Sequence, residues 1–523
     1  MSLLKNVGTI GSLTAISRVF GFVRDVLIAR LLGATAMGDA WQLAFMLPNI
    51  FRRLFAEGAF ASAFVPLFNR RMKEDGDIGQ ARHFAESVLS VLLPMLIAFG
   101  GIAMMVLPWV VEYFIADEVA TDKDSLSTAI MLARITFPYL LFMSLATLIA
   151  AILNSLSRFA AAAAAPILLN ICLISALIYG ASLDLGLSSQ RQTALAMSWA
   201  LSLSGLLQVI WLWSFMRRAG FSLSLIFPRI DGGVKELGIL VIPAIFGAGI
   251  YQISRFFDLF FLSTLPVGSY TYLQMADRWN QLPLGIIGIA LGTAILPALS
   301  RHLSRAEDDE AARLQANAIE LSLLLTVPCA VALFFTGTAF TQVFMQGQNF
   351  TEQDALTTGT VVSGLVLGLP AYVLVKVLTP NFFARKDTRT PVCTAAASLI
   401  VTISLNFVLV PRIGVLGLAI AGAVGAWCNI ALLTAILHAK GFFQLPLAVV
   451  SRAARIILAA AIMGAGLWWL MPQIAPMFTG SIATKALGIG AILAAGALTY
   501  GPAAFLLGVL DKRTAQRLMR GQT

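Results

Sequence analysis

Long apolar stretches, separated by short polar or charged segments, follow one another along nearly the whole chain. An α-helix needs about 20 largely apolar residues to cross a bilayer, and the chain offers fourteen such segments. The pattern therefore predicts an all-α polytopic membrane protein of about 14 transmembrane helices. The predicted segments are residues 8–31, 37–68, 84–115, 127–153, 159–181, 193–216, 236–265, 269–299, 315–346, 354–383, 391–410, 415–438, 453–471 and 482–508.

The composition supports lipid as the solvent for much of this chain. Hydrophobic residues make up 59% of the sequence and charged residues only 12%, whereas a soluble domain has about 45–50% and about 25%. A soluble fold could not keep so much apolar surface out of water. The net charge of +10 does not predict a nucleic-acid partner, because the cations lie between or within the apolar segments.

The placement of the basic residues predicts the topology. If the N-terminus is cytoplasmic, 23 of the 36 Lys and Arg residues fall in cytoplasmic connections and only 5 in connections on the other side. Short cytoplasmic loops of membrane proteins carry such an excess of Lys and Arg. The sequence thus predicts that both termini are cytoplasmic.

A weak internal repeat divides the predicted segments into two groups. An offset of 231 residues places Arg24 on Arg255 and Asn49 on Asn280, and relates further Pro and Arg positions in the same way. We therefore expect two pseudo-symmetric six-helix lobes with the substrate path at their interface. The expected division is an N-lobe at 1–216, a cytoplasmic interfacial linker at 217–235, a C-lobe at 236–440, and a C-terminal helix pair with a cytoplasmic tail at 441–523. This pair is either an incidental hairpin or a surface for a lipid chain.

Charged residues at membrane depth are the main candidates for function. Each costs about 2.5–3.5 kcal/mol on insertion scales, so a group of them requires a polar cavity or mutual pairing. The helical period places those of segment 8–31 on one arc with Ser17. The candidates are Ser17, Arg18, Arg24, Asp25, Asp39, Asn49, Arg52, Arg53, Glu57, Arg255, Asp277 and Arg278.

The arginines among these candidates indicate the kind of ligand that the site binds. A guanidinium stays charged when buried and binds phosphate oxygens with two parallel hydrogen bonds. The sequence therefore predicts an anionic, phosphate-bearing cargo, with the carboxylates holding or resetting the arginines. The alternative is that Arg–Asp pairs only fix helix register. Arg134 and Lys376 are isolated at membrane depth, where snorkelling or local pairing is the simpler interpretation.

Several long motifs resemble the MurJ (MviN-type) lipid II flippase family. The resemblance covers essentially the whole chain and implies a fold of the multidrug/oligosaccharidyl-lipid/polysaccharide exporter superfamily. It also implies that Arg18, Arg24, Arg52 and Arg278 correspond to cavity arginines of the family, whereas Arg255 is added from the repeat alone. The motifs are residues 16–25 (ISRVFGFVRD), 39–40 (DA), 47–60 (LPNIFRRLFAEGAF), 276–278 (ADR), 282–283 (LP) and 292–297 (GTAILP).

The resemblance implies alternating-access transport of lipid II, an undecaprenyl-diphosphate-linked precursor of peptidoglycan, to the outer leaflet of the bacterial cytoplasmic membrane. Expected partners are lipid II and membrane lipids, with a possible link to peptidoglycan synthases, and the protein is expected to be a monomer. No cofactor is expected. The coupling ion stays open, because some relatives bind sodium with carboxylate help and segment 391–410 contains no Asp or Glu.

Three other functions remain as alternatives. A flippase for another polyprenyl-diphosphate-linked polysaccharide unit would share the phosphate chemistry, whereas a drug or cation exporter would favour carboxylates in its cavity. A polyprenyl-phosphate enzyme would need clustered metal-binding acids or a nucleophile with its base. His83, His302 and His438 lie at segment ends and the chain contains no GxxxxGK[ST] motif, so we do not expect an enzyme.

Overall fold

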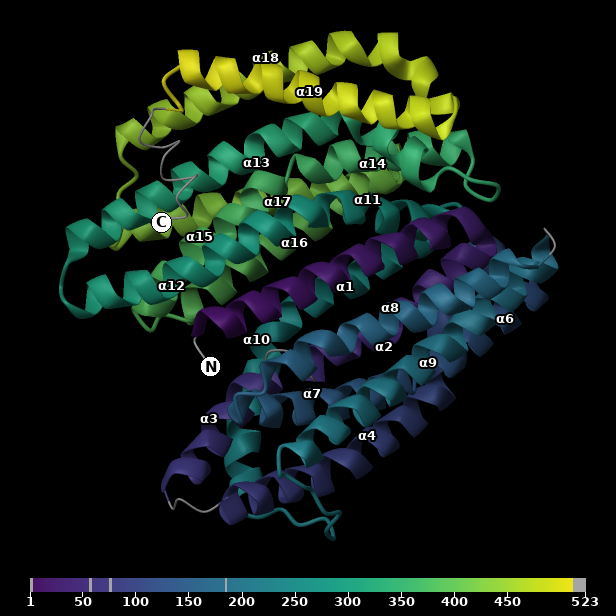
Figure 1. The fold of residues 1–523 in the computed structure, drawn as a ribbon, viewed down its shortest axis with the longest axis vertical. Coiled ribbons are helices and arrows are strands. Elements are labelled where there is room, and N and C mark those ends of the chain that lie inside the picture. Colours follow the sequence, from purple (N-terminus) through teal and green to yellow (C-terminus); the bar gives the residue numbers. More distant parts are fainter. Residues whose placement is uncertain (1–2, 56–58, 75–77, 184–185, 511–523) are drawn as a thin grey trace. The chain divides into compact units, whose positions relative to one another are not determined.

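The computed structural model describes residues 3–55, 59–74, 78–183 and 186–510, and within these ranges it contains helices and no strand (Figure 1). The chain forms two compact units. The first comprises residues 1–271 and 347–350, and the second comprises 272–346 and 351–523. Each unit has apolar cores of its own.

The first unit is built from ten helices and the start of an eleventh in the described residues. One apolar core of this unit lies among α3, α4, α7, α8, α9 and α10, where Phe64 stacks on Phe60, Phe68 and Phe84. The helices are α1 Leu3–Leu31, α2 Ala36–Phe55, α3 Ala59–Glu74, α4 Ile78–Phe114, α5 Asp117–Thr121, α6 Lys123–Thr136, α7 Tyr139–Ser155, α8 Phe159–Ala181, α9 Leu187–Arg218, α10 Gly232–Ser263 and α11 Ser269–Pro283.

The second unit continues from α11 and ends with the C-terminal helix pair. In Figure 1 this pair, α18 and α19, is drawn in yellow-green and yellow, and both helices pack against α13. The further elements are the π-helix η1 Leu284–Gly288, α12 Ile289–Ser304, α13 Asp308–Met345, α14 Glu352–Val366, α15 Leu369–Ala384, α16 Arg389–Ile413, α17 Val415–Ala439, α18 Leu447–Ile474, the 3₁₀-helix η2 Ala475–Thr479 and α19 Ile482–Leu506.

The all-α fold is confirmed, and every predicted segment overlaps at least one helix. Within the described residues, ten helices are long and apolar enough to cross a membrane. The predicted segments outside these ten are 8–31, 37–68, 236–265 and 269–299, which contain most of the charges expected at membrane depth. The exact count of fourteen stays a prediction.

Small residues allow the helices of each unit to approach closely, as is common in membranes. In the first unit, a Cβ on Gly180 of α8 would lie 2.4 Å from the Thr193 hydroxyl of α9. In the second, a Cβ on Gly425 of α17 would lie 2.0 Å from the Thr402 hydroxyl of α16. At either position a larger side chain would require the threonine of the neighbouring helix to shift.

The connection between α9 and α10 has no regular structure from residue 221 to 231. Its start is anchored by Phe221, which is buried against Phe68, while Phe227 is 81% exposed. At the start of α10, Glu236 pairs with Arg70 and Arg71 of α3 at 2.7 and 3.0 Å. The first compact unit thus includes α10, whereas the sequence repeat assigns 236–265 to the second lobe. The predicted division by repeat therefore stays a prediction.

Candidate functional site

Arg24 on α1 lies in a buried polar cluster of the first unit. Its Nε and Nη2 atoms donate to Asp25 Oδ1 at 2.9 and 2.7 Å, and Nη1 donates to Asn170 Oδ1 of α8 at 3.0 Å. The Phe45 ring centroid lies 5.9 Å from its Cζ atom. Arg24 is 7% exposed and Asp25 is 4% exposed. Burial of this charge is thus compensated by a carboxylate, an amide and an aromatic face.

Asn170 of α8 links the Arg24 guanidinium to the backbone of α1, the helix that carries Arg24. The Asn170 Nδ2 atom donates to the Ser17 carbonyl oxygen at 3.0 Å and lies 3.5 Å from the Ser17 hydroxyl. Gly21 of α1 faces the Asn170 amide, and a Cβ at this position would lie 3.8 Å from it. The structure therefore brings Ser17, Arg24 and Asp25 together. Arg18, predicted for the same arc, has an exposed side chain.

The α2 candidates occupy different environments. Asn49 accepts a bond from Arg52 Nε at 3.1 Å through its Oδ1 atom and donates to the Phe45 carbonyl oxygen at 2.8 Å, so it orients the half-buried Arg52. Arg53 is exposed. Glu57 lies outside the described residues, so its predicted role has no structural counterpart here.

Asp39 is fully buried and holds the beginning of α11. Its Oδ2 atom accepts from the Gly268 backbone N–H at 2.7 Å, and Oδ1 accepts from the Thr271 N–H and hydroxyl at 3.0 and 2.8 Å. Backbone N–H groups at a helix start lack intrahelical acceptors, and a carboxylate there also complements the helix dipole. The geometry gives Asp39 a structural task between α2 and α11, and its expected support of a polar cavity stays a prediction.

The remaining candidates lie on α10 and α11. Arg255 and Asp258 of the first unit pair at 3.6 Å, one turn apart on α10. In the second unit, Asp277 accepts a bond from Gln281 at 3.2 Å, and Arg278 is half-buried beside it. The two sequence-related arginines Arg24 and Arg255 thus both sit beside a carboxylate of their own helix.

Lys376 of α15 lies against two glycines, Gly288 of η1 and Gly292 of α12. A Cβ on Gly288 would lie 3.3 Å from Lys376 Cδ, and one on Gly292 would lie 3.5 Å from Lys376 Cβ. Gly288 ends the π-helix η1, and single-turn π-helices occur often at functional sites. The glycines therefore make room for the lysine side chain.

Asn170 is the site residue that sequence reasoning did not select. An asparagine within an apolar segment is a weak signal by itself, although an offset of 236 residues, five more than that of the main repeat, relates it to Asn406. Within the described residues, no group of three or more His, Cys, Asp or Glu side chains could hold a metal ion. The coupling ion consequently stays open.

The fold belongs to a known class of transporters. A solved structure titled as the inward-facing conformation of a multidrug resistance MATE family transporter of the MOP superfamily matches with a TM-score of 0.62 at 12% identity, covering 86% of this chain and 98% of that one. The structure titled "Lipid II flippase MurJ, inward closed conformation" matches with a TM-score of 0.76 at 23% identity, covering 95% and 98%. The polytopic all-helical fold is thereby confirmed.

The family is shown by the sequence itself. The family model described as lipid II flippase MurJ matches residues 28–487. A probable lipid II flippase MurJ of Rhizobium meliloti (strain 1021) is 39% identical over 512 residues, covering 97% of this chain and 94% of the relative. The chain belongs to the MurJ family, which confirms the resemblance read from the motifs.

Proposed function

We propose that this chain is a flippase that moves lipid II from the inner to the outer leaflet of the bacterial cytoplasmic membrane. The observation that carries this function is the family match over residues 28–487, joined by 39% identity to a probable lipid II flippase along nearly the whole chain. Ten candidate membrane spans in the described residues fit a multi-pass membrane protein. No chemical bond of the cargo needs to change in this process.

The Arg24 cluster supports a site for the diphosphate of the cargo. Three of the five guanidinium N–H groups are bonded to Asp25 and Asn170, and the other two have no acceptor among the described residues. A guanidinium held in plane by its neighbours loses little freedom when it binds a phosphate oxygen. Arg18, Arg52, Arg255 and Arg278 are proposed as further headgroup ligands, with Asn49, Arg53 and Asp277 supporting them.

Alternating access is the mechanism that we propose for this site. The two lobes expose the arginines first to one side of the membrane and then to the other. Asp25 competes with the diphosphate for Arg24, so the salt bridge seen at 2.7 Å would re-form when the cargo leaves. Binding is then strong enough to replace lost hydration and weak enough to permit release.

The polyprenyl tail is proposed to stay in lipid along the C-terminal helix pair. Trp468 and Trp469 of α18 are 68% and 66% exposed, and Leu498 of α19 is 74% exposed. Such a surface suits contact with a long hydrocarbon chain. Both termini are proposed to be cytoplasmic, the protein a monomer, and the peptidoglycan synthases its functional neighbours.

Reconstitution in liposomes tests this function. Purified full-length protein should move labelled lipid II across the bilayer, and Arg24→Ala should slow the initial rate more than tenfold. Arg24→Lys should remain slow, because an ammonium group lacks the planar fork. Arg412→Ala is the matched control, since Arg412 is exposed near the end of α16 and has no partner among the described residues.

The outcomes separate the proposal from its alternatives. Wild-type rates in both Arg24 variants would remove the headgroup site. Equal transport of a polyprenyl diphosphate that carries an unrelated oligosaccharide would replace lipid II by that broader cargo class. Folding is checked by size-exclusion chromatography, so that a lost rate is not confused with a lost protein.

A further inference from the structure

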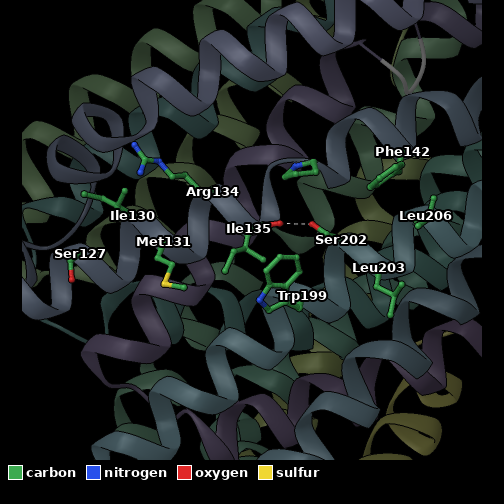
Figure 2. A pocket seen from close by; sticks show the side chains of 11 residues that line it. Ser127, Ile130, Met131, Arg134, Ile135, Phe142, Trp199, Ser202, Leu203 and Leu206 are labelled. Atoms are coloured by element: carbon green, nitrogen blue, oxygen red, sulfur yellow. Dashed lines mark hydrogen bonds between the residues drawn. The ribbon is translucent and has the colours of Figure 1, made fainter.

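A groove on the flank of the first unit lies apart from the Arg24 cluster. It has a volume of about 560 Å³ and is formed by α6, the start of α7 and the middle of α9 (Figure 2). Its floor is fixed where Ser202 of α9 donates a hydrogen bond to the Ile135 carbonyl oxygen. Gly205 permits this close approach, since a Cβ there would lie 2.9 Å from Phe142 Cβ.

The groove has one polar end and one apolar end. In Figure 2, Ser127 and Arg134 lie toward one side, whereas Phe142 and Leu206 lie toward the other. Arg134 has an exposed side chain and makes no hydrogen bond or ion pair with any described residue. None of the eleven described residues that line the groove is acidic. Among the described lining residues, the one formal charge is therefore the Arg134 guanidinium, which has no described acidic neighbour in the groove.

Helix lengths place this polar end at a membrane boundary. The predicted segment 127–153 places Arg134 at membrane depth, but the span Lys123–Ser155 has 33 residues, more than the hydrocarbon core requires. With the end of α7 at one face of the core, about twenty residues or about 30 Å of helix place Arg134 at the other face. On α9, Trp199 precedes the terminal Arg218 by nearly the same length and is 63% exposed. Tryptophan is enriched at membrane–water interfaces, where lipid phosphates lie. Two helices therefore place the same end of the groove at phosphate level.

The other end reaches into the hydrocarbon region. Leu203 and Leu206 lie one and two turns farther along α9 from Trp199, and they are 52% and 38% exposed. Phe142 lies two turns farther along the chain than Arg134. The lining thus changes from charged to apolar in the direction in which a phospholipid changes from phosphate to acyl chain.

We propose that this groove binds one anionic phospholipid of the surrounding bilayer, with its phosphate on Arg134 and an acyl chain between α7 and α9. A guanidinium binds a phosphate bidentately and does so best when no protein carboxylate competes for it. Snorkelling of Arg134 into water is the competing interpretation, and it predicts no selective lipid retention. The proposal is independent of the cargo and of the Arg24 cluster.

Native mass spectrometry of the full-length protein with phosphatidylglycerol as the probe tests this proposal. The wild type should retain one phosphatidylglycerol in preference to phosphatidylcholine, and Arg134→Gln should lower this retention about tenfold. Leu206→Trp, which fills the apolar end and leaves the guanidinium in place, should lower it as well. Arg191→Gln is the matched control, because Arg191 is an exposed cation of α9 outside the groove and should leave retention unchanged.

Each contrary result has a defined meaning. Unchanged retention in Arg134→Gln would overturn the phosphate site, and unchanged retention in Leu206→Trp would overturn the acyl-chain position. Equal retention of phosphatidylcholine and phosphatidylglycerol by the wild type would also overturn the proposal. If a variant elutes as aggregate, a fluorescence measurement on the wild type replaces the retention measurement on that variant. Acyl-brominated phosphatidylglycerol should quench the fluorescence of Trp199, and Trp199→Phe gives the baseline. Absence of a quenched Trp199 component would contradict the proposal.

Discussion

Arg24 combines a buried charge with a hydrogen-bonding capacity that its neighbours fill only in part. Asp25 supplies the compensating charge, and among the described residues Asn170 accepts the hydrogen bond that joins the guanidinium to a different helix. A neutral amide in that place orients the guanidinium without neutralising it further. The division of tasks between a carboxylate and an amide therefore keeps Arg24 buried while it remains able to bind an anion.

Replacing Asn170 by Ala should impair transport through Arg24. The variant removes the acceptor of Nη1 and the donor to the Ser17 carbonyl oxygen. Hydrogen bonds to charged groups contribute about 1.5–3 kcal/mol, and about 1.4 kcal/mol corresponds to a factor of ten. We expect the initial rate of lipid II translocation in liposomes to fall about tenfold or more.

Asn406 of α16 provides the control for this prediction. It is 1% exposed and is related to Asn170 by the repeat, but its Oδ1 atom has no hydrogen-bond partner among the described residues. Asn406→Ala should therefore alter protein stability without the loss of lipid II translocation rate that we expect for Asn170→Ala. An equal loss of rate in both variants would indicate a general packing effect and contradict positioning of Arg24 by Asn170.

Asp387, between α15 and α16, gives a pH-dependent contribution to stability. The hydrogen bond from Lys440 Nζ at 2.7 Å and those from the Thr390 N–H and hydroxyl hold the pKa of this carboxyl well below its usual range. A depressed pKa stabilises the fold above the unfolded-state pKa of about 4, and this stabilisation is lost as the pH falls below it. Asp387→Asn should lower the melting temperature at pH 7 by about 1–3 °C.

Scans of melting temperature against pH test this prediction. The difference between the wild type and Asp387→Asn should shrink steadily below about pH 4. Asp309→Asn is the control, because Asp309 is exposed and makes no ion pair with a described residue. A difference that stays constant down to pH 3 would exclude titration of Asp387 as its cause.

At the scale of elements, helix ends connect segments that are far apart in the sequence. The 347–350 segment belongs to the first unit, where Asn349 donates its amide N–H to the Leu31 carbonyl oxygen at 2.7 Å and so satisfies the end of α1. Asp39 does the same for the start of α11. Because such partners depend on tertiary structure, local sequence patterns do not reveal them.

Gly33 permits the contact at the end of α1. Its φ angle is +68°, and a Cβ there would lie 1.6 Å from the Asn349 carbonyl oxygen. Gly33→Ala should therefore lower the free energy of unfolding, by about 1–2 kcal/mol for the left-handed backbone and about 1–3 kcal/mol for overpacking. Thermal unfolding of the purified protein measures this effect.

Gly11→Ala is the matched substitution within α1, the helix that ends just before Gly33. A Cβ on Gly11 meets no atom within 4 Å, and alanine favours a helix over glycine by about 1 kcal/mol. We expect this variant to be as stable as the wild type or slightly more stable. Similar destabilisation by both substitutions would place the cause in helix α1 itself instead of the Gly33–Asn349 contact.

At the scale of the whole molecule, long apolar runs were sufficient to predict where most helices lie. Predicted segment 159–181 coincides with α8, because charged or polar residues flank a continuous apolar run. Segment 127–153 divides into α6 and α7 at Pro138, and the short α5 at Asp117–Thr121 was not predicted. A search for long apolar runs detects neither a break within a run nor a five-residue helix in a polar connection.

The candidate site was predictable by residue type but not by environment. Helical geometry placed Ser17, Arg24 and Asp25 on one face of segment 8–31, and the structure brings these residues together around Asn170. The same geometry could not distinguish exposed Arg18 from buried Arg24, because exposure depends on which helix packs alongside. It also could not show that Asp39 caps α11, since that contact joins residues more than 200 positions apart.

The placement of the basic residues predicts the topology of the whole molecule. Phe227 and Leu447 lie in connections predicted to be cytoplasmic, and Leu187 and Ile482 in connections predicted to lie on the opposite side. These four side chains are 81%, 86%, 82% and 88% exposed, so differences in labelling would report the side of the membrane and not burial. Single cysteines at these positions, in a background without the four native cysteines, form a matched set.

A membrane-impermeant maleimide applied to intact spheroplasts measures the side on which each cysteine lies. Leu187→Cys and Ile482→Cys should react at once, whereas Phe227→Cys and Leu447→Cys should react only after permeabilisation. Fourteen spans place an even number of crossings between Leu187 and Ile482 and an odd number between Phe227 and Ile482. Protection of Ile482→Cys in spheroplasts that label Leu187→Cys would mean that one charged segment, such as 236–265, does not cross the membrane, and the predicted count would then be wrong.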